Sequence, residues 1–306
     1  MDNLKWKISK QYEGLLLREY LLQVRGISRR ILTAIKFEGG RLLVNNSDVN
    51  VRHQLLDSDV VEVIFPPEKR SELLVPEPIP LDIVYEDDDV LVLNKAPHMA
   101  TIPSSHHLSH TLANGIIHHY NLQQIPYTVH VVTRLDRDTS GLLLIAKHRY
   151  SHSILFSEQH EAKVNRHYQA IIAGQLTEKE GVLDYPIDRA PDSIIERLVA
   201  STGKRAVTHY QVKEELADIS LLDIQLETGR THQIRVHFSS ISHPLIGDSL
   251  YGGDTTKLQR QALHCHKLAF NHPLTKKRME FEIPLANDLE LFLQEFKEEV
   301  TTKPLE

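Results

Sequence analysis

A cluster of prolines between residues 66 and 80 is the sequence feature that most constrains the fold. Five of the 14 prolines in this 306-residue chain fall there: Pro66, Pro67, Pro76, Pro78 and Pro80. Proline fixes the backbone φ angle and lacks an amide hydrogen, so this segment can be neither a helix nor a central strand. We therefore interpret residues 66–80 as a linker between a small module at residues 1–65 and a larger domain at residues 81–306.

The sequence of the small module predicts two helices followed by a small sheet. A leucine-rich run at residues 15–24 is typical of a short buried helix, and Ser28 is placed to cap a second helix. Strand patterns follow at residues 42–44 and 60–65. In the second helix three apolar residues would be buried and three basic residues would face outward: Ile31, Leu32 and Ile35, and Arg29, Arg30 and Lys36.

The charge of this module differs from that of the whole chain. Residues 1–67 carry ten basic and eight acidic residues, whereas the chain has a formal net charge of −6. The overall charge argues mildly against nucleic-acid binding, which usually needs a basic surface, but six basic residues between Lys10 and Lys36 form a local exception. They would suit an RNA backbone. On charge alone, a solvated helix face is the simpler interpretation.

The larger domain has more predicted strands than helices. Helical patterns occupy residues 149–163, 230–241 and 286–299. Strand patterns occur at residues 82–85, 90–94, 167–173, 207–212, 219–226, 263–270 and 279–283. Because strands and helices do not alternate regularly, we predict an α+β fold with a mixed, largely antiparallel sheet.

Composition and hydropathy exclude several classes of protein. Hydrophobic residues make up 41% of the chain, which is enough for a core, and no apolar run approaches the ~20 residues of a membrane-spanning helix. Residues 1–7 have no apolar stretch behind their charges, unlike a signal peptide. The single cysteine, Cys265, cannot form an internal disulfide. We therefore expect a cytoplasmic protein that does not contact a membrane.

The most unusual segment reads Thr-Arg-Leu-Asp-Arg-Asp-Thr-Ser-Gly-Leu at residues 133–142. It places Asp136 and Asp138 beside Arg134 and Arg137, between two apolar runs. Charges in such a position are costly to bury unless they are paired. A carboxylate that adjacent guanidinium groups keep ionised has a lowered pKa, and it can act as a nucleophile or an electrostatic stabiliser. A charged turn held by an Arg–Asp pair explains the same residues equally well.

Three further segments carry polar groups in a fixed order. Residues 166–171 predict a strand with Tyr168 and Ala170 on one face. Residues 226–237 read Leu-Glu-Thr-Gly-Arg-Thr-His-Gln-Ile-Arg-Val-His, and residues 247–253 read Gly-Asp-Ser-Leu-Tyr-Gly-Gly. No glycine-rich phosphate loop of the Walker or dinucleotide type is present in the sequence. Each segment alone has an ordinary structural explanation.

Together, in this order and spacing, the four segments resemble the RluA/RluD-type pseudouridine synthase family. The resemblance covers residues 83–284, and residues 12–65 resemble the αL RNA-binding module, of the ribosomal protein S-four type, that often precedes this catalytic domain. It implies an isomerase that breaks the N-glycosidic bond of a uridine in RNA, turns the uracil and rejoins it through carbon 5. It implies no cofactor, metal or nucleotide. A basic N-terminal module favours a structured substrate, ribosomal RNA before tRNA, and a monomer is the default expectation.

The resemblance also implies catalytic residues. Asp136 falls at the catalytic aspartate, which is the nucleophile or the base that acts on the sugar. Arg235 falls at the basic residue that pairs with this aspartate and keeps it ionised. Tyr168 falls at the active-site tyrosine, whose ring can stack on the target base. Two other carboxylates are expected to be structural, with Asp138 holding its loop and Asp248 a later turn.

Four further residues are implied to bind the substrate. Arg134 falls at the residue that fills the gap left by the uridine, since the target base must leave its stack. Arg137 and Arg230 are expected to serve the structure or to contact phosphate, and Leu263 to wall the base pocket. We expect the arginines to form a local basic cleft despite the acidic net charge. One departure concerns His98, which stands where the family usually has glycine and so puts the shape of its loop in question.

Two other functions remain to be weighed. A catalytically silent RNA-binding protein would require the loss of Asp136, Arg235 or Tyr168, and all three are present. A metal-dependent phosphotransferase would use Asp136 with Asp138. Histidines invite a zinc site, but the sequence has no cysteine pairs, so we predict no metal site. The histidine-rich candidates are His106, His107, His110, His118 and His119, and His264-Cys265-His266.

Overall fold

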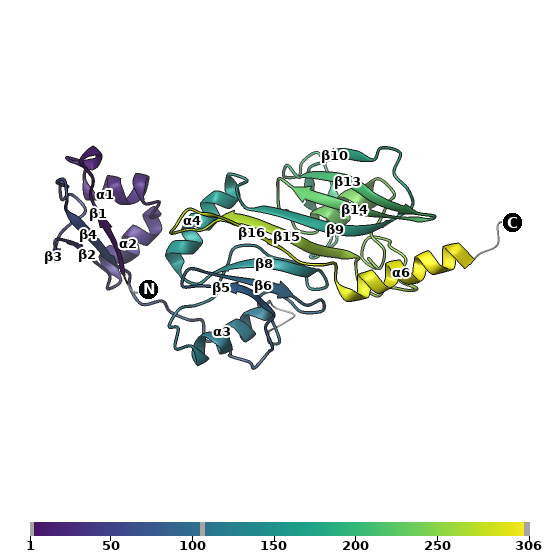
Figure 1. Cartoon of the computed structure of the whole chain (residues 1–306), viewed down its shortest axis with the longest axis horizontal. Helices are drawn as coiled ribbons and strands as arrows, with labels where there is room; N and C mark the ends of the chain where they lie inside the picture. The colour runs from purple at the N-terminus through teal and green to yellow at the C-terminus, as the bar shows by residue number, and fades with distance from the viewer. Residues whose placement is uncertain (1–2, 105–107, 303–306) are drawn as a thin grey trace.

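The computed structural model describes residues 3–104 and 108–302. It forms a four-stranded sheet near the N-terminus, a 10-stranded sheet that holds most of the strands, and a two-stranded hairpin. Figure 1 shows the two larger sheets at separate places in the molecule. The small sheet is antiparallel with the order β1-β4-β2-β3. Its strands are β1 (Asn3–Lys7), β2 (Arg41–Val44), β3 (Ser47–Asp48) and β4 (Val60–Ile64).

The large sheet has the order β10-β13-β14-β9-β15-β8-β6-β5, with β16 paired to β15 and β7 paired to β8. All of these pairs are antiparallel except β15 with β8. The α+β class with a mixed, largely antiparallel sheet is therefore confirmed. The strands are β5 (Ile83–Glu86), β6 (Val90–Lys95), β7 (His130–Val131), β8 (Ser140–Ala146), β9 (Asn165–Ala173), β10 (Glu180–Asp184), β13 (Val207–Leu216), β14 (Ile219–Leu226), β15 (Leu263–Asn271) and β16 (Arg278–Glu282), and the separate hairpin is β11 (Ile187–Arg189) with β12 (Arg197–Val199).

The helices differ from the sequence expectation in three places. The helix expected over residues 15–24 is one α-helical turn followed by a π-helical turn at Tyr20–Val24. The helix expected from residue 230 begins at Gln233, and a helix at residues 112–122 was not predicted. The α-helices are α1 (Leu17–Glu19), α2 (Arg29–Phe37), α3 (Leu112–Leu122), α4 (Arg149–His160), α5 (Gln233–Ser240) and α6 (Asn287–Thr302). No helix within residues 3–104 and 108–302 is long and apolar enough to cross a membrane.

Helix α2 begins and packs as its sequence predicts. The Ser28 hydroxyl accepts a hydrogen bond from the Ile31 amide at 3.3 Å, which satisfies one of the free amides at the helix start. The three apolar residues of the helix are buried, and its three basic residues are exposed.

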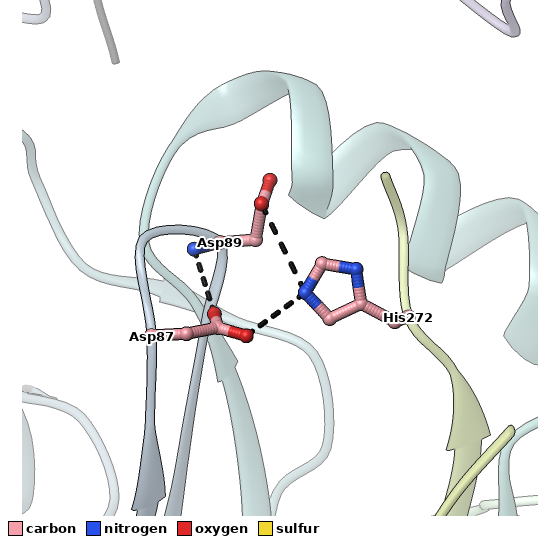
Figure 2. Close-up of side chains that lie close together, drawn as sticks. All are labelled: Asp87, Asp89 and His272. Atoms are coloured by element: carbon pink, nitrogen blue, oxygen red, sulfur yellow. Dashed lines mark hydrogen bonds and ion pairs between the residues drawn. The ribbon is translucent and has the colours of Figure 1, made fainter. Parts of the chain in front are cut away.

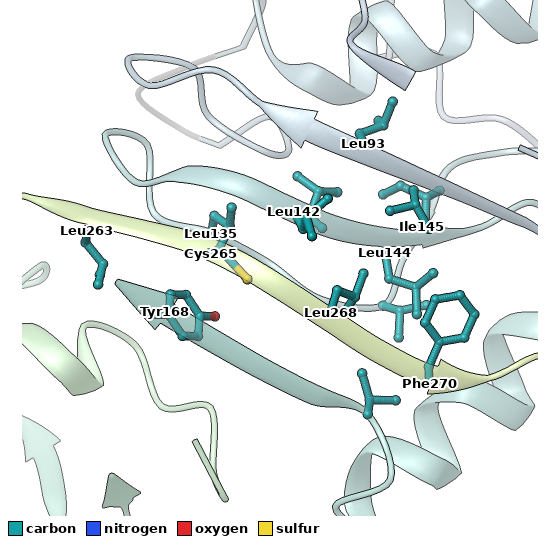
Figure 3. Packing of buried hydrophobic residues seen from close by; sticks show 14 of the residues in the cluster. Leu93, Leu135, Leu142, Leu144, Ile145, Tyr168, Leu263, Cys265, Leu268 and Phe270 are labelled. Carbon is teal, nitrogen blue, oxygen red and sulfur yellow. The ribbon is translucent and has the colours of Figure 1, made fainter. Parts of the chain in front are cut away.

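The main hydrophobic core lies on the large sheet, where β8 is buried along its whole length (Figure 3). Gly141 of β8 sits beside Cys265 of β15 in the parallel pair. A Cβ at Gly141 would lie 2.3 Å from the Cys265 carbonyl oxygen, and its φ of +111° disfavours other residues. This glycine therefore permits the close approach of β15 to β8.

The proline-rich segment has neither helix nor strand, and hydrogen bonds attach it to the large domain. The buried Glu68 carboxylate accepts hydrogen bonds from the amides of Thr128 and Arg149, at 3.2 and 2.8 Å, and lies 2.7 Å from His130 Nε2. Burial alone would raise the pKa of Glu68, but His130 and the two amides outweigh burial and lower it to about 2. Arg70 adds a hydrogen bond to the Tyr127 carbonyl.

Helix α4 joins the core of the small module to that of the large domain. Its Tyr150 and Ile154 pack in the same hydrophobic cluster as Trp6 and Phe65, whereas its Leu155 packs in the cluster of the large sheet. The Tyr150 hydroxyl also donates a hydrogen bond to the Arg25 carbonyl at 3.0 Å. The small module therefore packs against α4, the helix that also lines the cleft next to Asp136.

Candidate active site

Asp136 lies in the loop between β7 and β8. The loop backbone is tied down on both sides of this residue. The Thr101 hydroxyl donates a hydrogen bond to the Leu135 carbonyl at 3.0 Å, and the Thr139 amide donates one to the Asp136 carbonyl at 3.1 Å. The buried Leu135 side chain anchors the loop in the core. The Asp136 carboxylate remains 28% exposed, so it faces a space that a ligand can reach.

Arg235 on α5 holds Asp136 and Asp248 together. Its Nε and Nη2 donate hydrogen bonds to the two carboxylate oxygens of Asp248 at 2.7 and 2.8 Å, and its Nη1 donates one to Asp136 Oδ2 at 3.2 Å. Burial alone would lower the pKa of Arg235, but Asp248, aided by Asp136, outweighs burial and raises it. The buried guanidinium is therefore always charged, and it places a fixed positive charge beside the Asp136 carboxylate.

Tyr168 and Leu263 supply the apolar side of the site. Tyr168 on β9 is paired with Cys265 on β15, and both side chains are buried next to Leu263 in the main core (Figure 3). Burial raises the pKa of the Tyr168 hydroxyl above its ordinary value, so this hydroxyl stays protonated and can donate a hydrogen bond at neutral pH. The ring and the leucine offer surfaces for a flat base.

These groups line one cavity, here called the inner cavity, with about 430 Å³ of empty space. The structure brings six of the seven predicted site residues to it: Arg134, Asp136, Tyr168, Arg230, Arg235 and Leu263. The seventh, Arg137, lines a wider neighbouring cleft of about 1180 Å³, here called the outer cleft. Arg134, Asp136 and Arg230 line both spaces, so they stand where the two meet.

A buried lysine holds the backbone around Arg137 through hydrogen bonds. Lys95 Nζ donates hydrogen bonds to the carbonyls of Ala96, Met99 and Arg137 at 2.8 to 3.0 Å. Burial lowers the pKa of Lys95 to about 7. The Arg137 side chain itself is 52% exposed and points into the outer cleft, consistent with a binding group and not with one in contact with Asp136.

Sequence reasoning missed three polar residues of the site. His232 Nε2 lies 3.8 Å from Asp136 Oδ2, and burial lowers the pKa of its ring. Asp248 accepts a hydrogen bond from the Leu250 amide within its turn, as expected, but it also accepts hydrogen bonds from the Arg235 guanidinium. Arg166 lines both the inner cavity and the outer cleft. The sequence does not indicate these positions, because they depend on segments that only the fold brings together.

Asp138 contacts other partners than Asp136 does. Its Oδ1 lies 2.9 Å from His98 Nδ1, and its backbone carbonyl accepts a hydrogen bond from Arg260. His98 has a φ of +62°, the left-handed conformation that glycine usually supplies, so the loop keeps that shape although the residue differs. Because Asp136 and Asp138 contact different partners, they do not form the joint metal site that a phosphotransferase would need.

Asp87, Asp89 and His272 form a compact acidic and histidine cluster whose donor atoms could suit a metal ion (Figure 2). His272 Nδ1 accepts hydrogen bonds from two backbone amides, those of Leu274 and Thr275. Its Nε2 therefore carries the ring proton and donates a hydrogen bond to Asp87 Oδ2 at 2.9 Å. A metal would have to displace this proton, so the contacts assign the cluster to fastening the β5–β6 and β15–β16 turns.

Among the other histidine candidates, His119, His264 and His266 have polar partners within the protein. The buried His264 bonds the Pro284 carbonyl through Nε2 and the Ser140 hydroxyl through Nδ1, and burial lowers its pKa to about 4. His266 faces Asp223. The predictions for His106 and His107 fall outside the described residues.

Comparison with known proteins places this site in context. Residues 89–240 match the family model described as RNA pseudouridylate synthase. The chain is similar to an uncharacterized RNA pseudouridine synthase, YjbO of Bacillus subtilis, with 53% identity over 264 residues that cover 86% of this chain and 93% of the relative. It is also 38% identical to ribosomal large subunit pseudouridine synthase D of Pasteurella multocida, over 80% of each chain.

A solved structure supports the fold. Human RNA pseudouridylate synthase domain containing 1 superposes with a TM-score of 0.56 at 24% sequence identity, covering 77% of this chain and 98% of the human chain. The match to the family model is a separate finding: it begins just before β6 and ends with α5, so it includes the loop that carries Asp136.

Proposed function

The chain belongs to the RNA pseudouridine synthase family and is an RNA pseudouridine synthase; from this premise we propose that it isomerises a uridine in structured ribosomal RNA, with Asp136 as the essential group. The observation that carries the proposal is the contact of Asp136 with Arg235 inside a cavity bounded by Tyr168 and Leu263. A charged carboxylate and a flat apolar pocket meet there, which suits a sugar and its base.

The charges of the site fit the breaking of a glycosidic bond. Heterolysis sends the electron pair of the bond to the uracil and leaves positive charge on the sugar, as in other glycosyl transfers. Arg235 lies between Asp136 and Asp248, so the three groups together carry one net negative charge. We assign that charge to Asp136, as the nucleophile or the base at the sugar. Arg235 holds this carboxylate in position beside the sugar.

The cavity also explains how the freed uracil is retained. The target base must leave its stack to reach Asp136, which costs a few kcal/mol. We propose that Tyr168 and Leu263 hold the base by stacking and packing while it turns and that Arg134 fills the gap it leaves. Carbon 5 of the uracil then bonds to the sugar, the hydrogen on carbon 5 leaves as a proton, and N1 of the uracil takes up a proton, so the product is an isomer of uridine. Each step uses side chains of this chain, so we propose that no nucleotide cofactor takes part.

We propose that the small module, with boundaries at residues 1–65, also binds RNA. A third cleft, of about 1210 Å³, lies between α2 and α4 and is lined by Arg30 and Arg149. His152 and the 49%-exposed Phe156 line both this cleft and the outer cleft. A strand of RNA could therefore run from Asp136 over α4 to α2, with an unpaired base on the Phe156 ring.

The substrate class is proposed from two features. The relative from Pasteurella multocida is named for the large ribosomal subunit. The outer cleft and the cleft between α2 and α4 share His152 and Phe156, so they offer a folded RNA more contacts beyond the inner cavity. We propose that the chain acts as a monomer. A ribosomal RNA substrate places it in the cytoplasm.

The proposal is tested with RNA labelled with tritium on carbon 5 of uracil. Transcripts of large-subunit ribosomal RNA and of tRNAs are incubated with the purified chain in the presence of EDTA, and tritium release is followed. We expect release from a ribosomal transcript. Release from tRNA alone would overturn the proposed substrate class. No release from any transcript to which the protein binds would favour the silent RNA-binding protein.

A further inference from the structure

Three arginines are buried in the part of the chain that the structure describes, and two of them are neutralised by carboxylates. Arg235 binds Asp248 and Asp136. Arg260 binds both oxygens of Asp288, at 2.6 and 2.8 Å. The third, Arg166, is only 7% exposed. In these two cases a carboxylate compensates the charge of the buried guanidinium.

Arg166 has no such partner. Within residues 3–104 and 108–302 its side chain makes no hydrogen bond and no ion pair, and its Nε is buried without an acceptor. An uncompensated buried charge is strongly destabilising, so such groups are rare unless a ligand or a metal compensates them. The protein therefore carries a cost at Arg166 that its own residues do not offset.

The position of Arg166 indicates where the compensation comes from. Arg166 lies two residues before Tyr168 on β9, so both side chains are on the same face of the sheet. It lines both the inner cavity and the outer cleft, as do the exposed Arg134 and Arg230. Gly229 makes room for it, because a Cβ there would lie 2.9 Å from Arg166 Nη2.

We propose that Arg166 binds a phosphodiester of the RNA backbone at the point where the target nucleotide passes from the outer cleft into the inner cavity. The phosphodiester is the only group of RNA with a full negative charge, and its two free oxygens match the planar fork of a guanidinium. A carbonyl oxygen of uracil would accept a hydrogen bond but would not neutralise the charge. The proposal rests on the proposed function, because the nucleotide in the cavity is the flipped uridine.

This assignment separates stability from binding. Replacing Arg166 by Met removes a buried unpaired charge with an apolar side chain of similar length, so the variant should unfold at the same temperature as the wild type or higher. The same change should weaken RNA binding. Arg260→Met is the matched control, because it removes an equally buried arginine but leaves Asp288 without its partner. That variant should unfold at a lower temperature.

The experiment combines thermal unfolding with fluorescence anisotropy. The probe is a fluorescein-labelled oligouridylate of about 12 nucleotides, titrated with wild type, Arg166→Met, Arg166→Lys and Arg260→Met over a series of salt concentrations. Conversion of uridine to pseudouridine leaves every phosphate in place, so turnover does not disturb the measurement. We expect Arg166→Met to raise the Kd at least about tenfold. We expect the slope of log Kd against log salt to fall by about 0.7, the loss of one phosphate contact. Arg166→Lys should keep the slope and lose part of the affinity.

Three results would overturn the inference. Unfolding of Arg166→Met at a temperature as low as that of Arg260→Met would make Arg166 a structural residue. An unchanged Kd would show that Arg166 does not contact RNA. A raised Kd with an unchanged salt slope would assign the guanidinium to an uncharged oxygen of the nucleotide and exclude the phosphodiester.

The inference and the proposed function can fail separately. If wild type binds the probe and forms no pseudouridine in any transcript, but Arg166→Met loses the phosphate-dependent slope, the inference stands and the isomerase proposal fails. If wild type forms pseudouridine and Arg166→Met binds and reacts like wild type, only the inference fails.

Discussion

The small module places the basic side chains of α2 outside, whereas the large domain buries three arginines, two of which line the candidate active site. In the module, Arg29, Arg30 and Lys36 are exposed on α2, and the interior is apolar. In the inner cavity, Arg235 is buried between two carboxylates. Exposed charges bind a polyanion weakly and reversibly, and buried charges fix the geometry of a reaction. The comparison predicts that mutations that break the paired charges of the cavity, Arg235 with Asp136 and Asp248, cost stability and activity together, whereas mutations in the module cost affinity alone.

The largest effect is expected for Asp248→Asn. This change leaves Arg235 buried with one charged partner, and breaking a buried ion pair costs about 3–5 kcal/mol. Thermal unfolding should shift accordingly, and pseudouridine formation should fall because Arg235 no longer holds Asp136 in place. A variant that unfolds like the wild type would contradict the view that the cavity depends on this pair.

A smaller effect is expected at the junction of the two regions, for Glu68→Gln. The folded-state pKa of Glu68 is about 2, below its ordinary value of 4.5. The stability from this shift is therefore present above pH 4.5 and is lost as the pH falls towards 2. At neutral pH, Glu68→Gln should lower the free energy of unfolding by about 2–3 kcal/mol.

The measurement for Glu68 is urea unfolding between pH 2 and pH 7. The difference between wild type and Glu68→Gln should shrink steadily as the pH falls below 4.5. A difference that stays constant with pH would show that the carboxylate charge of Glu68 is not what ties the proline-rich segment to the large domain.

The smallest effect is expected for Arg30→Gln in the small module. Because Arg30 is exposed and lines the cleft between α2 and α4, the unfolding temperature should not change. RNA affinity should fall by about threefold at moderate salt, with a salt slope lower by about 0.7–0.9. Lys36→Gln is the control, since Lys36 is equally exposed but does not line that cleft. Equal losses in both variants would indicate a diffuse charge effect and not an RNA path.

Much of the fold could be predicted where one residue pattern decides one element. The Ser28 cap and the apolar face of α2 are local, and the structure confirms both. Helix α3 was missed because its Gly115 weakens the helical pattern. That glycine is there for a tertiary reason, since a Cβ would lie 3.1 Å from side chains of Ile79 and Leu81. Helix α5 starts later than expected because His232 has a φ of +58°.

The candidate site divides in the same way. Asp136, Arg235 and Tyr168 were identified through motifs, and the structure brings them to one cavity. The pairing of Arg235 with Asp248 and the isolation of Arg166 were not predicted, because they depend on which side chains lack or find a partner after folding. A sequence pattern names charged residues but does not say which of them are neutralised.

The most direct test of the central claim is pseudouridine formation by Asp136→Asn, with Asp138→Asn as the matched control. Both changes remove one carboxylate charge from the same loop, but only Asp136 contacts Arg235. We predict that Asp136→Asn binds ribosomal RNA transcripts and forms no pseudouridine, and that Asp138→Asn keeps most of its activity. Pseudouridine formation by Asp136→Asn at a rate near that of the wild type would contradict the account.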